Sequence, residues 1–201
     1  MKHISEIMQA APVIPVLVID EIERAVPIAS ALVDGGLPVL EVTLRTPVAL
    51  EAIEEMRKVD GAIVGAGTVV DEQGLNSSIS AGAEFIVSPG LTHSLGRAAV
   101  DAEIPFLPGV ATAGDIMCGL ELGLTHFKFF PAEANGGIPA LKALSGPFGQ
   151  CRFCPTGGIK EATAPDWLAL EPVLCVGGSW LGSGDTDTIQ DLARAASAMR
   201  R

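Results

Sequence analysis

Short apolar segments rich in β-branched and aromatic residues recur along the chain, and polar or amphipathic stretches separate them. Their starts lie about 20 to 26 residues apart, the length of one β-strand with the helix that follows it. Residues typical of helix starts lie between them, as at Asp71, at Thr112 with Asp115, and at Thr46 with Pro47. The pattern predicts eight strands, over residues 13–18, 38–44, 62–68, 85–88, 105–109, 126–130, 152–156 and 173–177.

Eight strands that alternate with helices predict a closed (β/α)8 TIM barrel of the α/β class. Such barrels typically have about 250 residues and can form with about 200, and this chain has 201. We therefore expect one domain over residues 1–201, with a short N-terminal helix over residues 2–10 at the lower end of the barrel. A doubly wound open sheet is the alternative, but it usually has about five to seven strands and an acidic ribose-binding residue that this sequence lacks at the expected place.

The composition is that of a folded protein with a large apolar core. Hydrophobic residues make up 48% and charged residues 18% of the chain, which excludes disorder, collagen and coiled coil. The formal net charge of −11 disfavours nucleic acid and anionic membranes as partners, so an anionic ligand must be held by local groups. No apolar run is long enough for a membrane span or a secretory signal, and we expect a cytoplasmic protein.

Several familiar site motifs are incomplete in this sequence. Cys151 and Cys154 form a C-x-x-C pair, but on a strand they would point to opposite faces, which suits neither a redox pair nor a shared metal. Gly65 and Gly67 lack the third glycine of a dinucleotide-binding motif. With three histidines and no Cys/His cluster, the sequence predicts no metal site and no cofactor.

Lys128 is the most unusual residue of the sequence, because it is one of only five lysines and lies between two phenylalanines in a predicted strand. If Phe127 and Phe129 face the helices, Lys128 points into the barrel, on the same face as His126 and Phe130. Lysine is almost never buried without a partner, and an apolar cavity favours its neutral, nucleophilic form. Lys128 is therefore a candidate nucleophile for a carbonyl group. The alternatives are a side chain that extends to the strand end or pairs with a core carboxylate.

The second predicted strand provides companions for this lysine. Glu41, Thr43 and Arg45 share one face of it while the other face is apolar, which places the polar set in the barrel lumen. Glu41 could form a simple salt bridge with Lys128 or shuttle protons for carbonyl–amine chemistry. Arg45 lies at the strand end, where its planar guanidinium could hold a substrate carboxylate through two hydrogen bonds.

Other strand ends supply further candidates for the same face of the barrel. Thr68 ends the third predicted strand, and Pro89 follows the fourth. Paired glycines let backbone N–H groups approach an anion, and the loops after strands seven and eight are the usual phosphate site of TIM barrels. Simple turn geometry explains either pair alone, but two pairs at these two places predict a phosphorylated substrate. The residues concerned are Gly157, Gly158, Gly178 and Ser179.

Six segments of the sequence form a specific combination: Glu41-Val-Thr-Leu-Arg45, Gly65-Ala-Gly-Thr68, Ser88-Pro-Gly-Leu, Phe127-Lys128-Phe-Phe-Pro-Ala-Glu, Phe153-Cys-Pro-Thr-Gly-Gly158 and Gly177-Gly-Ser-Trp180. This combination resembles the 2-keto-3-deoxy-6-phosphogluconate (KDPG) aldolase family, which includes 4-hydroxy-2-oxoglutarate (KHG) aldolase. The resemblance extends from about Val13 to Leu181, nearly the whole chain. Two departures from the family pattern are Pro165, where the seventh helix is expected, and a short segment after Trp180.

The resemblance implies a role for each candidate residue. In the family, the lysine that matches Lys128 forms a Schiff base with the pyruvyl carbonyl, and the glutamate that matches Glu41 moves protons. The arginine that matches Arg45 binds the carboxylate. The remaining positions surround the pyruvyl group, matching Thr68, Pro89 and Phe130, or hold the phosphate, matching Gly157, Gly158, Gly178 and Ser179.

The resemblance also implies a reaction and an assembly. It implies a metal-independent class I aldolase, usually a homotrimer, that needs no cofactor. The expected reaction is cleavage of 2-dehydro-3-deoxy-6-phospho-D-gluconate to pyruvate and glyceraldehyde 3-phosphate in the Entner-Doudoroff pathway, with a side activity on 4-hydroxy-2-oxoglutarate. The alternatives are an aldolase for the epimer 2-dehydro-3-deoxy-6-phosphogalactonate and a non-catalytic barrel that binds sugar phosphates.

Overall fold

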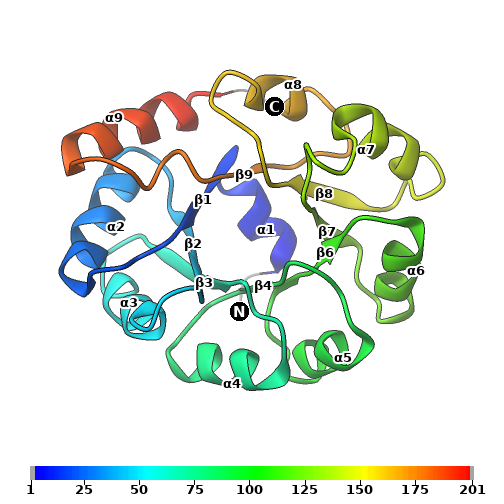
Figure 1. Ribbon diagram of the computed structural model, residues 1–201, viewed down its shortest axis with the longest axis horizontal. Coiled ribbons are helices and arrows are strands. Elements are labelled where there is room, and N and C mark those ends of the chain that lie inside the picture. Colours follow the sequence, from blue (N-terminus) through cyan, green and yellow to red (C-terminus); the bar gives the residue numbers. More distant parts are fainter. Residues whose placement is uncertain (1–2, 200–201) are drawn as a thin grey trace.

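Strands and helices alternate along the chain in the computed structural model, which describes residues 3–199 (Figure 1). The elements in chain order are α1 (Ile4–Gln9), β1 (Val13–Leu17), η1 (Ile22–Arg24), α2 (Ala25–Asp34), β2 (Val39–Thr43), α3 (Ala49–Met56), β3 (Ile63–Gly67), α4 (Glu72–Ser80), β4 (Ile86–Val87), α5 (His93–Asp101), β5 (Phe106–Leu107), β6 (Gly109–Val110), α6 (Ala113–Glu121), β7 (His126–Phe129), α7 (Gly137–Ser145), β8 (Arg152–Pro155), α8 (Ala164–Leu168), β9 (Val176–Gly178) and α9 (Thr186–Ser197).

The strands form a curled parallel sheet in two parts. Six strands pair in the order β5-β4-β3-β2-β1-β9, and three pair in the order β6-β7-β8. Only Pro108 separates β5 from β6, and isolated parallel bridges join Phe153 to Val173 and Thr156 to Gly177, between the β8 and β9 regions. In Figure 1 the strands occupy the middle of the molecule and α2 to α9 surround them. The predicted α/β class is confirmed, although the described pairing is not one continuous ring of eight strands.

Two predicted strands differ from the observed ones. The strand predicted over residues 105–109 is divided at Pro108, because proline has no N–H to donate to a neighbouring strand. The strand predicted over residues 173–177 begins only at Val176, because the chain changes its pairing partner. Val173 pairs with Phe153 of β8, whereas Val176 pairs with Val13 of β1. Each of the other six predictions contains an observed strand.

Helix starts follow the sequence in two of the three places named above. Asp71 caps α4, and Thr112 caps α6 in a reciprocal capping box with Asp115. The prediction at Thr46 and Pro47 is wrong, because α3 begins only at Ala49. The Thr46 hydroxyl instead donates to the carbonyl oxygen of Ile19 at 2.6 Å. It therefore ties the loop after β2 to the loop after β1.

The departure from the family pattern at Pro165 lies at the start of a short helix. α8 has five residues, and Pro165 lies in its first turn, where the N–H that proline lacks would have no partner within the helix. The segment after Trp180 forms no helix until α9, which Asp185 caps. Both departures therefore leave the strand order unchanged.

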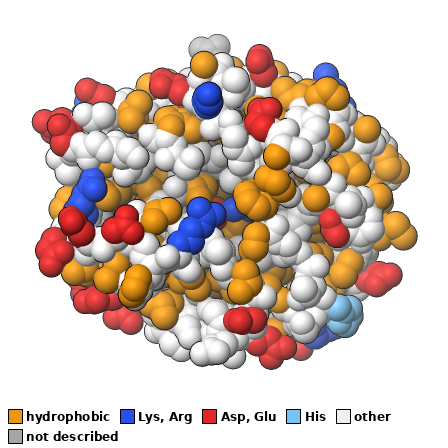
Figure 2. Space-filling view, viewed as in Figure 1, with side chains coloured by type: hydrophobic (Ala, Val, Ile, Leu, Met, Phe, Trp, Pro, Cys, Tyr) orange, Lys and Arg blue, Asp and Glu red, His pale blue; other side chains and the backbone are white. Residues whose placement is uncertain are grey.

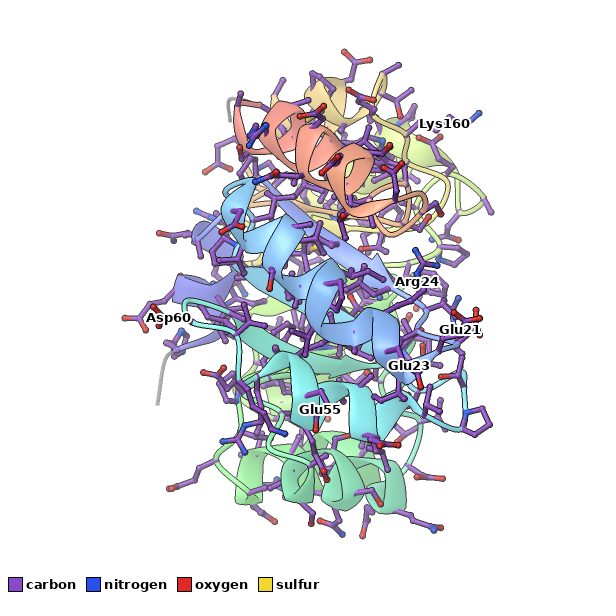
Figure 3. The ribbon with its side chains drawn as sticks, turned by 90° about the vertical axis from the view of Figure 1, so that its left-hand side faces the viewer. Glu21, Glu23, Arg24, Glu55, Asp60 and Lys160 are labelled. Atoms are coloured by element: carbon purple, nitrogen blue, oxygen red, sulfur yellow. The ribbon has the colours of Figure 1, made fainter. Side chains whose placement is uncertain are left out.

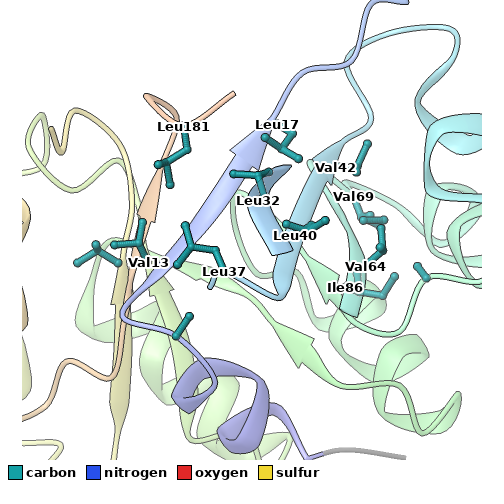
Figure 4. Packing of buried hydrophobic residues seen from close by; sticks show 14 of the residues in the cluster. Val13, Leu17, Leu32, Leu37, Leu40, Val42, Val64, Val69, Ile86 and Leu181 are labelled. Carbon is teal, nitrogen blue, oxygen red and sulfur yellow. The ribbon is translucent and has the colours of Figure 1, made fainter. Parts of the chain in front are cut away.

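Buried apolar side chains form two clusters, one on each side of the sheet. The outer cluster fills the space between strands and helices and includes alternate residues of the strands (Figure 4), such as Leu40 and Val42 of β2. Phe127 and Phe129 of β7 also belong to it, as predicted. Cys151 belongs to the outer cluster and Cys154 to the inner one, which confirms that they point to opposite faces.

The inner cluster brings α1 against the beginnings of the strands. It joins Ile7 and Met8 of α1 to residues such as Val39 and Ile63, which begin β2 and β3. α1 thus covers the sheet interior at the amino ends of the strands. It is shorter than the predicted range of 2–10, whose residue 2 lies outside the described residues.

The loops that follow the strands open on one end of the molecule. Figure 3 shows Arg24, after β1, and Lys160, after β8, at this end, while Asp60, before β3, lies at the opposite end. Figure 2 views this end of the molecule: Lys and Arg side chains lie near its centre, bordered by hydrophobic ones, and acidic side chains lie mostly toward the rim. Within residues 3–199, no helix has the length and apolar character required to cross a membrane.

Asp71→Ala should lower the free energy of unfolding by about 1 kcal/mol, because its carboxylate accepts the Gly74 N–H at 2.7 Å at the start of α4. Urea denaturation measures the change, and Asp71→Asn, which keeps the acceptor, should restore most of it. Equal stability of the alanine variant and the wild type would show that the cap contributes nothing.

His126 should make the stability fall with acid below neutral pH. Burial lowers the pKa of its imidazole from 6.5, and the nearby His3 and Arg152 lower it further. The folded protein therefore binds fewer protons than the unfolded chain, and stability is lost as the pH falls below about 6.5, by at most about 1.4 kcal/mol per pH unit for one proton.

Urea denaturation between pH 7.5 and pH 5.5, in steps of about 0.5, checks this dependence. His126→Gln should flatten the profile, and His93→Gln, at an exposed position on α5, should leave it unchanged. A His126→Gln profile as steep as that of the wild type would assign the loss of stability to other groups.

Candidate active site

Lys128 and Glu41 form an ion pair in the interior of the sheet. Lys128 Nζ lies 3.0 Å from Glu41 Oε1, and their side chains are 7% and 4% exposed. Every other ion pair between described residues has at least one partner that is more than half exposed. Removal of two charges from water costs several kcal/mol per ion, so such a pair needs a reason beyond stability.

Strand geometry brings the two charges together. Alternation along β2 and β7 points Glu41 and Lys128 to the inner face, as the sequence predicted, and Thr43 lies on the same face as Glu41. Gly67 of β3 provides the room, because a Cβ atom at this position would overlap the Glu41 carboxylate. The sequence reasoning missed this role of Gly67, although a glycine inside a strand is itself a sign of close approach by another group.

An apolar wall stands on one side of the amine. The centre of the Phe130 ring lies 5.4 Å from Lys128 Nζ. Phe130 and Pro89 together line a cavity of about 360 Å³, to which Val69 and Val110 also contribute. The structure therefore places Phe130 beside the lysine, and Phe130 shares a cavity with Pro89.

Arg45 and Thr68 follow the adjacent strands β2 and β3. Arg45 is exposed, and its guanidinium has no hydrogen-bond or ion-pair partner among residues 3–199.

Thr68 has a positive φ of 61°, a conformation that costs a β-branched residue about 1 to 3 kcal/mol. Hydrogen bonds on either side hold it there, from Leu44 N to Gly67 O at 2.9 Å and from Val69 N to Val87 O at 3.2 Å. The hydroxyl of Thr43 already has a hydrogen-bond partner within the chain, since it donates to Leu17 O at 2.8 Å.

Two glycine turns lie at neighbouring strand ends. Gly157 and Gly158 both have positive φ, at 105° and 81°. In the described part of the chain, no acceptor receives the N–H groups of Gly157, Gly158 or Ile159. The bridge between Thr156 and Gly177 places the Gly178–Ser179 turn on the adjacent strand end. Successive N–H groups without partners form the kind of concave surface that binds anions.

Thr156 is a further inner-face residue that the sequence reasoning did not include among the candidates. It is buried between the two glycine turns, and a Cβ atom on Gly177 would overlap its hydroxyl group. The alternation of β8, which places Cys154 in the inner cluster, also indicates this position for Thr156. Within residues 3–199, no group of three or more His, Cys, Asp or Glu side chains is arranged to hold a metal ion.

Comparison with known proteins places the chain in a family. The family model described as KDPG and KHG aldolase matches residues 4–197. A 2-dehydro-3-deoxy-phosphogluconate aldolase from Zymomonas mobilis is 57% identical over 204 residues, covering 100% of this chain and 98% of that protein.

Solved structures agree with this placement. A Zymomonas mobilis ZM4 2-keto-3-deoxy-6-phosphogluconate aldolase with 3-phosphoglycerate superposes with a TM-score of 0.97 at 57% identity, covering 98% of this chain and 96% of that one. A Legionella pneumophila KDPG aldolase, with pyruvate captured at low pH as a covalent carbinolamine intermediate, gives a TM-score of 0.95 at 46% identity, covering 98% and 99%. With a family model that matches nearly all of its length, the chain belongs to the KDPG and KHG aldolases.

Proposed function

We propose that this chain is a class I aldolase that cleaves 2-dehydro-3-deoxy-6-phospho-D-gluconate to pyruvate and glyceraldehyde 3-phosphate, as in the Entner-Doudoroff pathway. The observation that carries the proposal is the buried contact between Lys128 Nζ and Glu41 Oε1 at 3.0 Å. A lysine enclosed beside one carboxylate can pass its proton to that carboxylate and then attack a carbonyl carbon as a neutral amine. Family membership supports the substrate class and adds 4-hydroxy-2-oxoglutarate as a second substrate.

The reaction uses these two side chains in sequence. Lys128 Nζ attacks C2 of the substrate, and Glu41 gives the oxygen the proton that it took from Lys128. Glu41 then moves a second proton from the nitrogen to the same oxygen, which leaves as water and gives a protonated imine. Glu41 then takes the proton of the C4 hydroxyl, and the C3–C4 bond breaks with its electron pair moving toward the imine nitrogen. The aldehyde product leaves. Protonation of the resulting enamine at C3 and hydrolysis of the imine then release pyruvate and restore Lys128.

The remaining candidate residues bind the two ends of the substrate. Arg45, whose guanidinium is uncommitted, holds the carboxylate, while Thr68, Pro89 and Phe130 surround the pyruvyl group. The phosphate binds at the paired glycine turns, to Gly157, Gly158, Gly178 and Ser179. Neither the catalytic pair nor these binding groups call for a metal ion or a cofactor.

The proposal includes the architecture and setting of the enzyme. We propose that the two sheet segments form one closed (β/α)8 barrel and a single domain over residues 1–201, supported by the bridges between the β8 and β9 regions and by the single residue between β5 and β6. The family resemblance supports a homotrimer that works in the cytoplasm.

Purified protein should release pyruvate from the phosphogluconate substrate, with a higher kcat/KM than for its galactonate epimer, in a cleavage assay coupled to pyruvate detection. Lys128→Ala should lose at least about 10³-fold in kcat, because no other group can form the imine. Lys142→Ala, at an exposed position on α7, is the matched control and should keep wild-type activity.

Each unexpected result of this assay would favour a different alternative. Preference for the galactonate epimer would reassign the substrate, and turnover of neither epimer by folded protein would favour a non-catalytic sugar-phosphate-binding barrel. A Lys128→Ala variant with near-normal activity would contradict the Schiff-base mechanism. Circular dichroism of each variant confirms folding, since removal of Lys128 leaves Glu41 buried without its cation.

Arg45→Lys should raise the dissociation constant for pyruvate by about tenfold, because an ammonium group cannot reproduce the planar two-bond contact of guanidinium with a carboxylate. Titration with pyruvate measures this, with Arg97→Lys at an exposed position on α5 as the control. Unchanged pyruvate affinity in Arg45→Lys would assign Arg45 a role outside substrate binding.

A further inference from the structure

The Gly157–Gly158 turn needs external support to keep its shape. Both residues have left-handed backbone conformations, and glycine loses more conformational freedom on ordering than any other residue. The turn lies in a segment without helix or strand between β8 and α8. Contacts from elsewhere in the chain must therefore fix the directions of its N–H groups.

The segment that follows β7 provides this support. Ala132 N donates to Thr156 O at 2.8 Å, and Glu133 N donates to Gly157 O at 3.1 Å, so its backbone runs along the start of the turn. The Glu133 side chain lies against the second glycine, since a Cβ atom on Gly158 would come within 2.8 Å of both Cβ and Cγ of Glu133. Glu133 thus contacts the turn through its backbone and through its aliphatic stem.

The carboxylate of Glu133 contacts α8, the helix that follows the Gly157–Gly158 turn. Its Oε1 accepts the indole N–H of Trp167 at 3.1 Å. Trp167 belongs to α8, the helix that follows the turn, and is 1% exposed, with its ring centre 6.3 Å from that of Phe129. A Cβ atom added to Gly137 would lie 3.6 Å from Glu133 Oε2. The carboxylate is therefore close to the amino end of α7, where a negative charge is favourable.

We propose that Glu133 is a positioning residue that holds the Gly157–Gly158 turn in its phosphate-binding form, through its hydrogen bond to Trp167 and the contact of its stem with Gly158. This inference rests on the proposed phosphate site. Glu133 acts on the turn and not on the reacting carbons, so its loss affects substrates in proportion to how much they depend on the phosphate.

The experiment compares two substrates that differ only in the phosphate, 2-dehydro-3-deoxy-6-phosphogluconate and 2-dehydro-3-deoxygluconate. Glu133→Ala should raise KM for the phosphorylated substrate by about tenfold while changing kcat/KM for the other less than about threefold. Glu133→Gln keeps an oxygen that can accept the indole N–H and should restore most of the affinity. Trp167→Phe, which removes the N–H and keeps a ring, should raise the same KM, and its effect should not add to that of Glu133→Ala.

Equal losses of kcat/KM for the two substrates in Glu133→Ala would overturn the proposal, since they indicate a general structural role, and so would an unchanged KM. Titration with inorganic phosphate separates this test from catalysis. Weaker phosphate binding by Glu133→Ala than by the wild type supports the positioning role even if the wild type cleaves neither substrate. Equal phosphate binding by the two proteins overturns the role whether or not the wild type is an aldolase.

Discussion

The contact between Lys128 and Glu41 is the constraint on which the rest of the site depends. Two charges at 3.0 Å in an almost fully buried place are expensive to desolvate, and loss of either leaves the other without a partner. Both side chains project from parallel strands and not from loops, so the sheet fixes their positions relative to each other. Gly67 leaves space for the carboxylate, and the inner cluster beneath the pair, sealed by α1, is apolar. The same enclosure that makes the pair costly also makes proton exchange between the two groups a direct step.

The charged side chains at the open end of the sheet are distributed in a way that suits an anionic substrate of this pair. The chain has a net charge of −11, yet basic side chains lie near the centre of this end and acidic ones mostly toward its rim (Figure 2). A substrate with a carboxylate at one end and a phosphate at the other is thus held by local groups. Arg45 can meet the carboxylate, and uncommitted backbone N–H groups at the Gly157–Gly158 turn can meet the phosphate. Because every paired strand is parallel, loops distant in sequence present these groups at one end of the molecule.

Sequence periodicity predicted the features that depend on alternation along single strands. It placed Lys128 and Glu41 on inner faces and Phe127 and Phe129 against the helices, because a side chain on a half-polar strand has only two directions. Features that depend on contacts between separate segments were not predictable in this way. The displaced start of α3 and the space that Gly67 leaves for Glu41 both require knowledge of which segment lies alongside. The hydrogen bond between Glu133 and Trp167 joins residues that are 34 positions apart, so it too was not predictable from periodicity.

In the proposed mechanism Lys128 forms a covalent imine with the keto group of the substrate, and reductive trapping can detect this imine. Incubation with pyruvate alone followed by borohydride should convert the imine to a stable secondary amine, because the last steps of the proposed reaction are reversible. Mass spectrometry of peptides should then locate the added pyruvyl mass on the peptide that contains Phe127-Lys128-Phe129. An adduct on Lys142 or Lys160, or no adduct under conditions in which the enzyme turns over, would contradict the assignment of Lys128 as the nucleophile.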